Sequence, residues 1–210
     1  MNQMLKNYWM ALTHPSTATF EQLKASVKTS HTLIGLIVAG LIAGLIGLAQ
    51  ALLKTILSGG GVETLVATMI GGVIGLVLSP IIVLGVYYIG QAIVWVIAKL
   101  FGGKGGLGLQ ASLNATFAVP LGIIGVILGA IPFIPFIGQV LSALVNLYAL
   151  FPLTLSLSVV HEYSKVKAFL TWFVIFVVVF LCTICFLVLL GPQIASVFQQ
   201  IIRGLETPTR

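Results

Sequence analysis

The sequence predicts an all-α fold: a polytopic transmembrane helical bundle with five spans, a cytosolic N-terminus and N-terminal amphipathic helices at the membrane interface. Of the 210 residues, 59% are hydrophobic and 7% are charged, whereas soluble domains are about 25% charged because a surface in water needs solvating groups. Apolar runs long enough for the roughly 20 helical residues that cross a bilayer recur along the chain. We therefore expect hydrocarbon to surround most of the chain.

Residues 1–31 are predicted to form an arm ahead of the first span. Tyr8 and Trp9 lie on an apolar stripe at helical spacing, and a second helix follows in which Thr19 and Gln22 can form a capping box. We expect both helices to lie at the membrane surface, with the two aromatic rings at headgroup depth. The alternative is an arm packed in the cytosol.

The transmembrane domain is predicted over residues 32–203, followed by a tail over 204–210. One apolar run would be roughly 55 Å long as a single helix, more than the ~30 Å of hydrocarbon, so it must tilt, kink or lie partly at the interface. Pro80 marks the expected break, and residues 132–135 make a short turn. The predicted spans cover residues 32–57, 64–101 with the break near 80, 110–131, 136–160 and 166–190.

The basic residues predict the orientation of the five spans. An odd number of spans places the two termini on opposite sides, and cytosolic segments carry an excess of Lys and Arg. A cytosolic N-terminus leaves the larger share of the basic residues inside. These are Lys6, Lys24, Lys28, Lys99, Lys104, Lys165 and Lys167, against Lys54, Arg203 and Arg210 outside.

Small residues recur at helical spacing in the first and third spans. Such faces lack bulky side chains, so the backbone of another helix can approach closely. We therefore predict that both spans use these faces for helix packing. The residues are Gly35, Ala39, Gly40, Ala43, Gly44 and Gly47 in the first span, and Gly122, Gly125 and Gly129 in the third.

A candidate polar cluster consists of Asn114, Gln139, Ser142 and Asn146, which lie within predicted spans. Polar groups inside a membrane normally face protein or water. We interpret these four chiefly as hydrogen-bonding partners between helices. The other interpretation is a permeation path for a lipid or a small neutral solute.

Residues 102–108 form a glycine-rich connector that lacks the Gly-Lys-Ser/Thr ending of a phosphate loop. We predict a flexible link, with the alternative that Lys99 and Lys104 contact lipid phosphates there. Cys182 and Cys185 form a CxxC inside an apolar run, where a thiolate would be costly. His161 is expected in a solvated loop. We therefore expect no enzymatic activity, no cofactor and no metal site.

Four stretches carry a resemblance to a known family: residues 147–168, which end in His-Glu-Tyr-Ser-Lys-Val-Lys-Ala, residues 101–106, Ala118-Val-Pro120, and residues 14–20. They resemble the Yip-one (Ypt-interacting protein) domain family of five-span membrane proteins. The resemblance implies a five-helix bundle with a cytosolic N-terminus. Eukaryotic relatives act in vesicle trafficking and contact prenylated Rab-type GTPases, whereas the short arm with one acid makes this chain more similar to the prokaryotic branch.

The function predicted from these observations is that of a non-enzymatic, multi-pass membrane protein of the Yip type, a trafficking-like scaffold that organises the membrane or docks partners. The alternative is a transporter for a lipid or a small neutral solute. Expected partners are membrane lipids and proteins at the cytosolic face, with a homo-oligomer left open. Nucleic acid is excluded because the basic residues flank apolar runs instead of gathering with aromatics. The membrane would be the cytoplasmic one in a prokaryote and a secretory-pathway membrane in a eukaryote.

Overall fold

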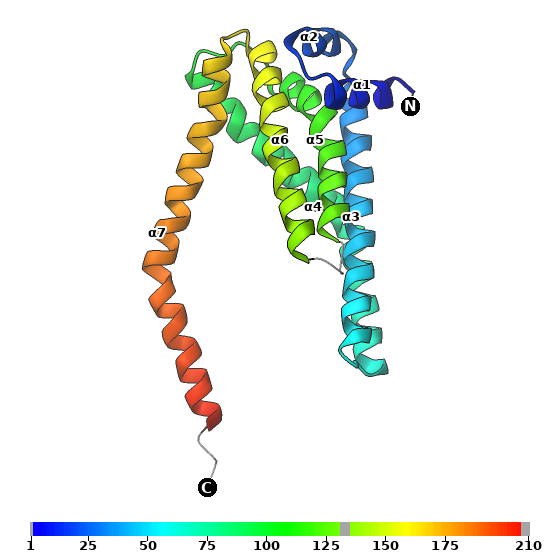
Figure 1. Cartoon of the computed structure of the whole chain (residues 1–210), viewed down its shortest axis with the longest axis vertical. Helices are drawn as coiled ribbons and strands as arrows, with labels where there is room; N and C mark the ends of the chain where they lie inside the picture. The colour runs from blue at the N-terminus through cyan, green and yellow to red at the C-terminus, as the bar shows by residue number, and fades with distance from the viewer. Residues whose placement is uncertain (1, 131–134, 207–210) are drawn as a thin grey trace. The chain divides into compact units, whose positions relative to one another are not determined.

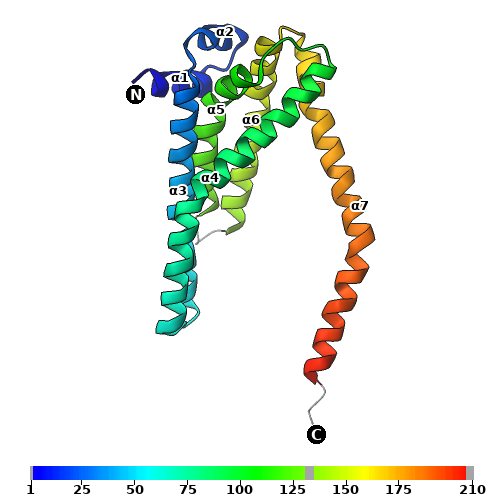
Figure 2. The ribbon, with the colours of Figure 1, turned by 180° about the vertical axis from the view of Figure 1, so that it is seen from behind.

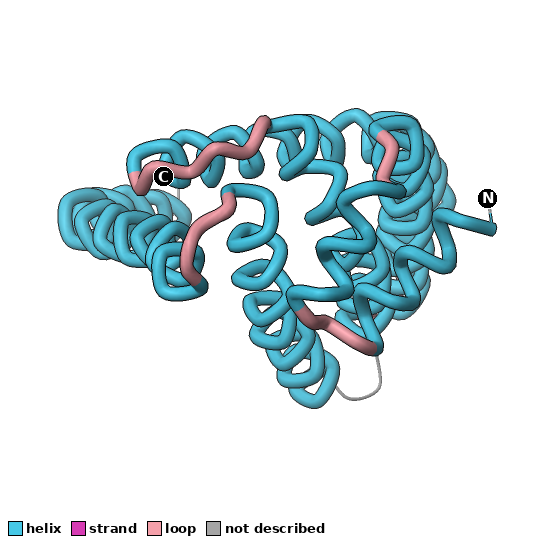
Figure 3. Tube along the Cα trace, turned by 90° about the horizontal axis from the view of Figure 1, so that it is seen from above, coloured by secondary structure: helices cyan, strands magenta, loops and turns pink. Residues whose placement is uncertain are grey.

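The computed structural model describes residues 2–130 and 135–206, and these form seven helices and no strand (Figure 1, Figure 3). The predicted turn over residues 132–135 falls almost entirely outside the described part, as do residues 207–210 of the predicted tail. The helices are α1 (Asn2–Thr13), α2 (Thr17–Ser26), α3 (Thr29–Leu57), α4 (Val62–Leu100), α5 (Leu107–Gly129), α6 (Pro135–His161) and α7 (Lys165–Glu206).

Five of these helices are long and apolar enough to cross a membrane, which confirms the predicted all-α fold with five spans. Their outward side chains are apolar and exposed, as is expected of helices that are surrounded by lipid. A helix suits this environment because it satisfies its own backbone hydrogen bonds in hydrocarbon. The candidate spans are Thr29–Leu57, Val62–Leu100, Leu107–Gly129, Phe136–His161 and Lys165–Leu190.

The chain divides into two units, Met1–Phe169 and Leu170–Arg210. The first unit holds α1 to α6 and the start of α7, and it contains the buried core. The second unit is the remainder of α7, whose apolar side chains, such as Val178 and Leu187, are largely exposed. α7 stays helical through Pro192, past the predicted end of the fifth span at residue 190.

α3 and α4 pack as an antiparallel hairpin whose turn contains Gly59 at a φ of 71°, a conformation that glycine adopts without a steric penalty. The run over residues 64–101 is part of one helix, and α4 changes direction along its length (Figure 2). Pro80 of α4 lies directly against α3. A Cβ on Gly40 would stand 2.5 Å from the Pro80 Cα, and the Ser79 hydroxyl donates a hydrogen bond to the Gly40 carbonyl oxygen at 2.7 Å.

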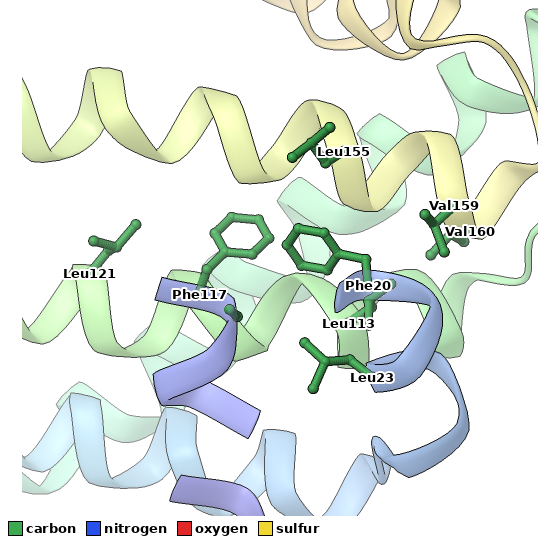
Figure 4. Close-up of a cluster of buried hydrophobic side chains, with 9 residues drawn as sticks. Phe20, Leu23, Leu113, Phe117, Leu121, Leu155, Val159 and Val160 are labelled. Carbon is green, nitrogen blue, oxygen red and sulfur yellow. The ribbon is translucent and has the colours of Figure 1, made fainter. Parts of the chain in front are cut away.

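α2 is docked on the ends of α5 and α6 (Figure 4). Phe20 and Leu23 point from α2 into a cluster that both of these helices complete, and Phe20 has no exposed surface. The ring of Phe20 meets Phe117 edge-on at a centroid distance of 6.1 Å, a favoured aromatic geometry. The buried members of this cluster are Ala11, Phe20, Leu23, Leu113, Phe117, Leu121, Leu155, Val159 and Val160.

The start of α2 differs from the predicted capping box. Ser16, in an extended conformation, is the N-cap, and its hydroxyl accepts from the Thr19 amide at 3.1 Å. The Thr19 hydroxyl instead donates to the His14 carbonyl oxygen at 2.7 Å. Ser16 takes the capping role because it is the last residue before the helical turn begins, where an oxygen can reach a free amide.

Candidate functional site

One end of the first unit carries a group of lysines from four separate segments, which we call the basic end: Lys24, Lys99, Lys104 and Lys167, with Glu162 among them. Glu162 lies 3.5 Å from the Lys24 ammonium nitrogen and 3.9 Å from that of Lys104. These contacts join α2, the α4–α5 connector and the loop after α6 on one surface. Exposed ion pairs of this kind contribute about 0 to 1 kcal/mol each to the stability of the fold. Their main effect here is to fix where the charged groups lie.

Backbone carbonyl oxygens accept the other hydrogen bonds of the basic end. Lys99 donates to the Lys104 carbonyl oxygen at 3.1 Å, and its ammonium lies 5.6 Å from the centre of the Trp95 ring. Lys24 donates to Val159 and Lys167 to Phe101, each at 3.4 Å. Because a carbonyl oxygen carries no net charge, these bonds orient the lysines without neutralising them.

The glycine-rich connector beneath the basic end is closely packed, contrary to the expected flexible link. Gly103 and Gly105 are buried. A Cβ on Gly103 would stand 2.5 Å from His161 Nδ1, and one on Gly105 would stand 2.5 Å from the Val160 carbonyl oxygen. The Lys104 amide donates to the His161 carbonyl oxygen at 3.2 Å. The glycines are therefore needed where the connector passes the end of α6.

A buried polar network joins α4, α5 and α6 just inside the bundle. Gln110 donates from Nε2 to the Gln91 carbonyl oxygen and to Gln91 Oε1, both at 2.9 Å. Asn114 donates to the same Oε1 at 2.8 Å, and Asn114 Oδ1 accepts from the Ser156 hydroxyl. Each of these amides satisfies the others, which is the arrangement that allows polar side chains to be buried.

His161 closes the network and is fully buried, so the expected solvated position is wrong. Its Nε2 lies 2.8 Å from Gln110 Oε1. An amide oxygen only accepts, so His161 donates from Nε2 in this hydrogen bond. Nδ1 is buried without a hydrogen-bond partner, and the ring stacks on Tyr163 at 5.4 Å between centroids.

The structure separates the members of the predicted polar cluster. Asn114 belongs to the buried network, on α5. Gln139 and Asn146 are exposed on α6, and Ser142 is half-buried on the same helix. Asn146 donates to the carbonyl oxygen of Ser142 at 2.8 Å, within its own helix.

The predicted small-residue faces have different surroundings along their lengths. Gly40 and Gly44 pack against α4, and a Cβ on Gly44 would stand 2.5 Å from the Ser79 hydroxyl. Gly35 is buried beneath Tyr8, and Ala39 packs against a core cluster centred on Leu36. Ala43 is half-buried. A Cβ on Gly125 would stand 3.7 Å from Ser142 Oγ, which is an ordinary contact distance. Open space surrounds the added Cβ at Gly47, Gly122 and Gly129.

The two aromatic residues of α1 have separate environments. Trp9 is 67% exposed, as a ring at headgroup depth would be. Tyr8 turns towards α3 and donates to the His31 carbonyl oxygen at 3.3 Å. Burial raises the pKa of Tyr8 to about 12, so its hydroxyl remains a donor at neutral pH.

Within the described residues, no group of three His, Cys, Asp or Glu side chains could hold a metal ion. Cys182 and Cys185 are unpaired thiols exposed on α7. Sequence reasoning missed Gln91, Gln110, Ser156 and His161 as network members. The one available signal was the spacing of Gln110 and Asn114, four residues apart on a helix, which puts both amides on one face.

Comparison with known families gives one match. The sequence model described as the Yip1 domain matches residues 9–188, which include α2, the buried network and the basic end. Neither the curated proteins nor the solved structures gave a match.

Proposed function

Because this chain belongs to the Yip1 domain family, we propose that it is a non-enzymatic, multi-pass membrane protein that docks protein partners at its basic end. The α2 cluster and the packing of the glycine connector hold α2, the end of α4 and the connector against α5 and α6, and Lys167 at the start of α7 donates to the Phe101 carbonyl oxygen. A rigid surface supports a docking role, since little ordering is needed when a partner binds. The proposed site faces the cytosol, the side that the excess of lysines favours.

The observation that carries this proposal is the charge balance of the basic end. The basic end holds four lysines and one carboxylate, Glu162, which pairs with Lys24 and Lys104. Three of the lysines donate to neutral carbonyl oxygens. The surface therefore keeps a net positive charge and suits a partner with an acidic face. Apart from His161, the described members of the buried network carry amide or hydroxyl side chains, which supports a structural role for it.

A site-specific crosslinking experiment tests the docking role. A photoreactive amino acid replaces Lys104, which is on the basic end, and in a matched control replaces Lys54, which is exposed near the opposite end of α3. We expect a protein adduct from position 104 only, weakened by raising the salt concentration because exposed charges are screened within about 8 Å at physiological salt. The adduct should also be lost with Lys24→Gln and Lys167→Gln. Equal adducts from both positions would contradict the proposal.

A flux assay in proteoliposomes separates docking from transport of a lipid or small neutral solute. The exposed position of Gln139 and Asn146 on α6 argues against a path through the bundle lined by them. We expect no flux above that of protein-free vesicles. Robust transport that Asn146→Leu abolishes would replace docking by a carrier function.

A further inference from the structure

An apolar groove of about 490 Å³ runs beneath α1, between the arm and the first and third spans. Its volume lies within the roughly 300 to 1,000 Å³ of small-molecule sites. The lining comes from the inner side of α1 and from facing positions of α3 and α5. The lining residues are Met4, Leu5, Tyr8, Trp9, Leu12, Gly35, Val38, Val119, Pro120 and Ile123.

The shape of the groove depends on Gly35. A Cβ on Gly35 would collide with the Tyr8 hydroxyl and would stand 3.3 Å from Val119 Cγ1. Without that Cβ, Tyr8 packs against α3 at Gly35 and lines the groove. Met4 and Val119 line the interior at 9% and 3% exposure, while the rim is formed by exposed side chains such as Val38 and Trp9.

The rim identifies what fills the groove. Val38 continues an exposed apolar row of α3 that includes Ile34 and Leu41. In a bilayer this row is covered by acyl chains. The groove therefore opens from a surface that hydrocarbon already occupies, and an acyl chain can enter it without leaving an apolar medium. Water has no polar partner there, because the lining is apolar apart from the Tyr8 hydroxyl.

A positive charge, that of Lys28, lies near the part of the groove that Met4 and Tyr8 line. A small cavity shares Met4 and Tyr8 with the groove and is lined further by Asn7, Lys28 and His31. Lys28 is exposed and has no ion-pair partner within the part of the chain that the structure describes. A lysine at headgroup level attracts anionic lipid phosphates.

We propose that this groove is a binding site for one anionic phospholipid of the surrounding bilayer, with an acyl chain beneath α1 and its phosphate beside Lys28. This site is separate from the basic end and does not depend on the docking function. The bound lipid would join the arm to the bundle, since its acyl chain would contact α1, α3 and α5 at once.

Photolabelling of the full chain in vesicles tests the site. The probe is a phosphatidylglycerol with a diazirine on its acyl chain. We expect labelled Met4 and Val119, which bulk lipid cannot reach because both are buried. Labels confined to exposed positions such as Val77 would overturn the proposal. This measurement needs no substitution, so it stands whether or not a variant folds.

Val38→Trp places an indole in the groove, and Val77→Trp is the matched control because Val77 is exposed on α4 and does not line the groove. Losing the burial of about two methylenes corresponds to a tenfold loss of affinity, so Val38→Trp should lower the labelling of Met4 about tenfold or more. The control should leave it unchanged. Equal labelling in both variants would overturn the site.

Competition with unlabelled lipids tests the headgroup. Phosphatidylglycerol should compete better than phosphatidylcholine, and Lys28→Gln should remove that preference. Equal competition by the two lipids in the unsubstituted chain would overturn the assignment of the phosphate to Lys28. Displacement by a free fatty acid at the same concentration as phosphatidylglycerol would replace the phospholipid by a simple fatty-acid ligand.

Discussion

His161, the last residue of α6, is hydrogen bonded through Nε2 to Oε1 of Gln110 in the first turn of α5, at 2.8 Å. The pair joins two side chains that are 51 residues apart in sequence, on consecutive helices. Both side chains are fully buried, so water cannot replace either partner in this hydrogen bond. The end of α6 is therefore held at a fixed position relative to α5.

The first prediction concerns this pair. His161→Leu should destabilise the protein by about 1 to 3 kcal/mol, because it leaves the Gln110 oxygen buried without a donor. Gln139→Leu is the control, since Gln139 is exposed, and it should change little. Thermal unfolding in detergent gives the comparison. A His161→Leu midpoint equal to that of the unsubstituted chain would show that the bond contributes nothing net.

The second prediction concerns the glycine connector. Gly105→Ala should destabilise by about 1 to 3 kcal/mol, because the new Cβ overlaps the Val160 backbone. Gly106→Ala is the matched control one residue on, where open space surrounds the added Cβ and φ is −86°. Because Gly106 is the N-cap of α5, where alanine is less favourable than glycine, that change should cost no more than about 1 kcal/mol. If both substitutions behave alike in thermal unfolding, the close packing of the connector is wrong.

The third prediction separates two glycines that share one sequence pattern. Gly40→Leu should force α3 and α4 apart at Pro80 and lower stability by about 1 to 3 kcal/mol. Gly47→Leu should be tolerated because no atom lies near its added Cβ. Cysteine crosslinking between α3 and α4 measures the separation directly. An effect of Gly47→Leu as large as that of Gly40→Leu would indicate a packing partner at Gly47.

The fourth prediction concerns the docking of the arm. Phe20→Ala should cost about 3 to 5 kcal/mol of local stability, since it empties a fully buried site beside Phe117. The arm should then exchange its amide hydrogens faster and become sensitive to protease. Trp9→Ala, at an exposed position, should leave exchange in α2 unchanged. Unaltered protection in Phe20→Ala would mean that other contacts hold the arm.

The fifth prediction is the orientation in the membrane. Five spans and the excess of lysines on one side predict a cytosolic N-terminus and a C-terminus on the other side. Reporter fusions that are active on one side only, placed at each end of the chain, measure this. Two ends on the same side would contradict the five-span topology.

The sequence was sufficient to predict the membrane spans, because the thickness of the bilayer requires a long apolar run for each crossing. It could not predict which polar side chains meet. Helical periodicity tells which residues share a face of one helix, but not which helix that face meets or at what height. Gln91 stands alone in an apolar run, and it joins Gln110 and Asn114 only because α4 crosses α5 there.

The same reasoning explains the mixed result for the small residues. Gly40 and Gly122 both fit a small-residue pattern, but only Gly40 has a neighbouring helix backbone against it. The local sequence of the connector also suggested flexibility, because glycine runs in solution are flexible. Its close packing depends on Val160 and His161, which lie far away in sequence.

α5 contacts α1, α2, α3, α4 and α6, so the third span is the common neighbour of every other helix that lies wholly in the first unit. This has a consequence for biogenesis. The arm and the first two spans leave the ribosome before α5 does, and their contacts with one another are then the α3–α4 hairpin, the contact of α1 with α2 and the packing of Tyr8 on α3. Insertion of the third span is therefore the step at which the earlier segments acquire their shared partner, and a nascent chain halted before it would display Phe20 and Leu23 uncovered.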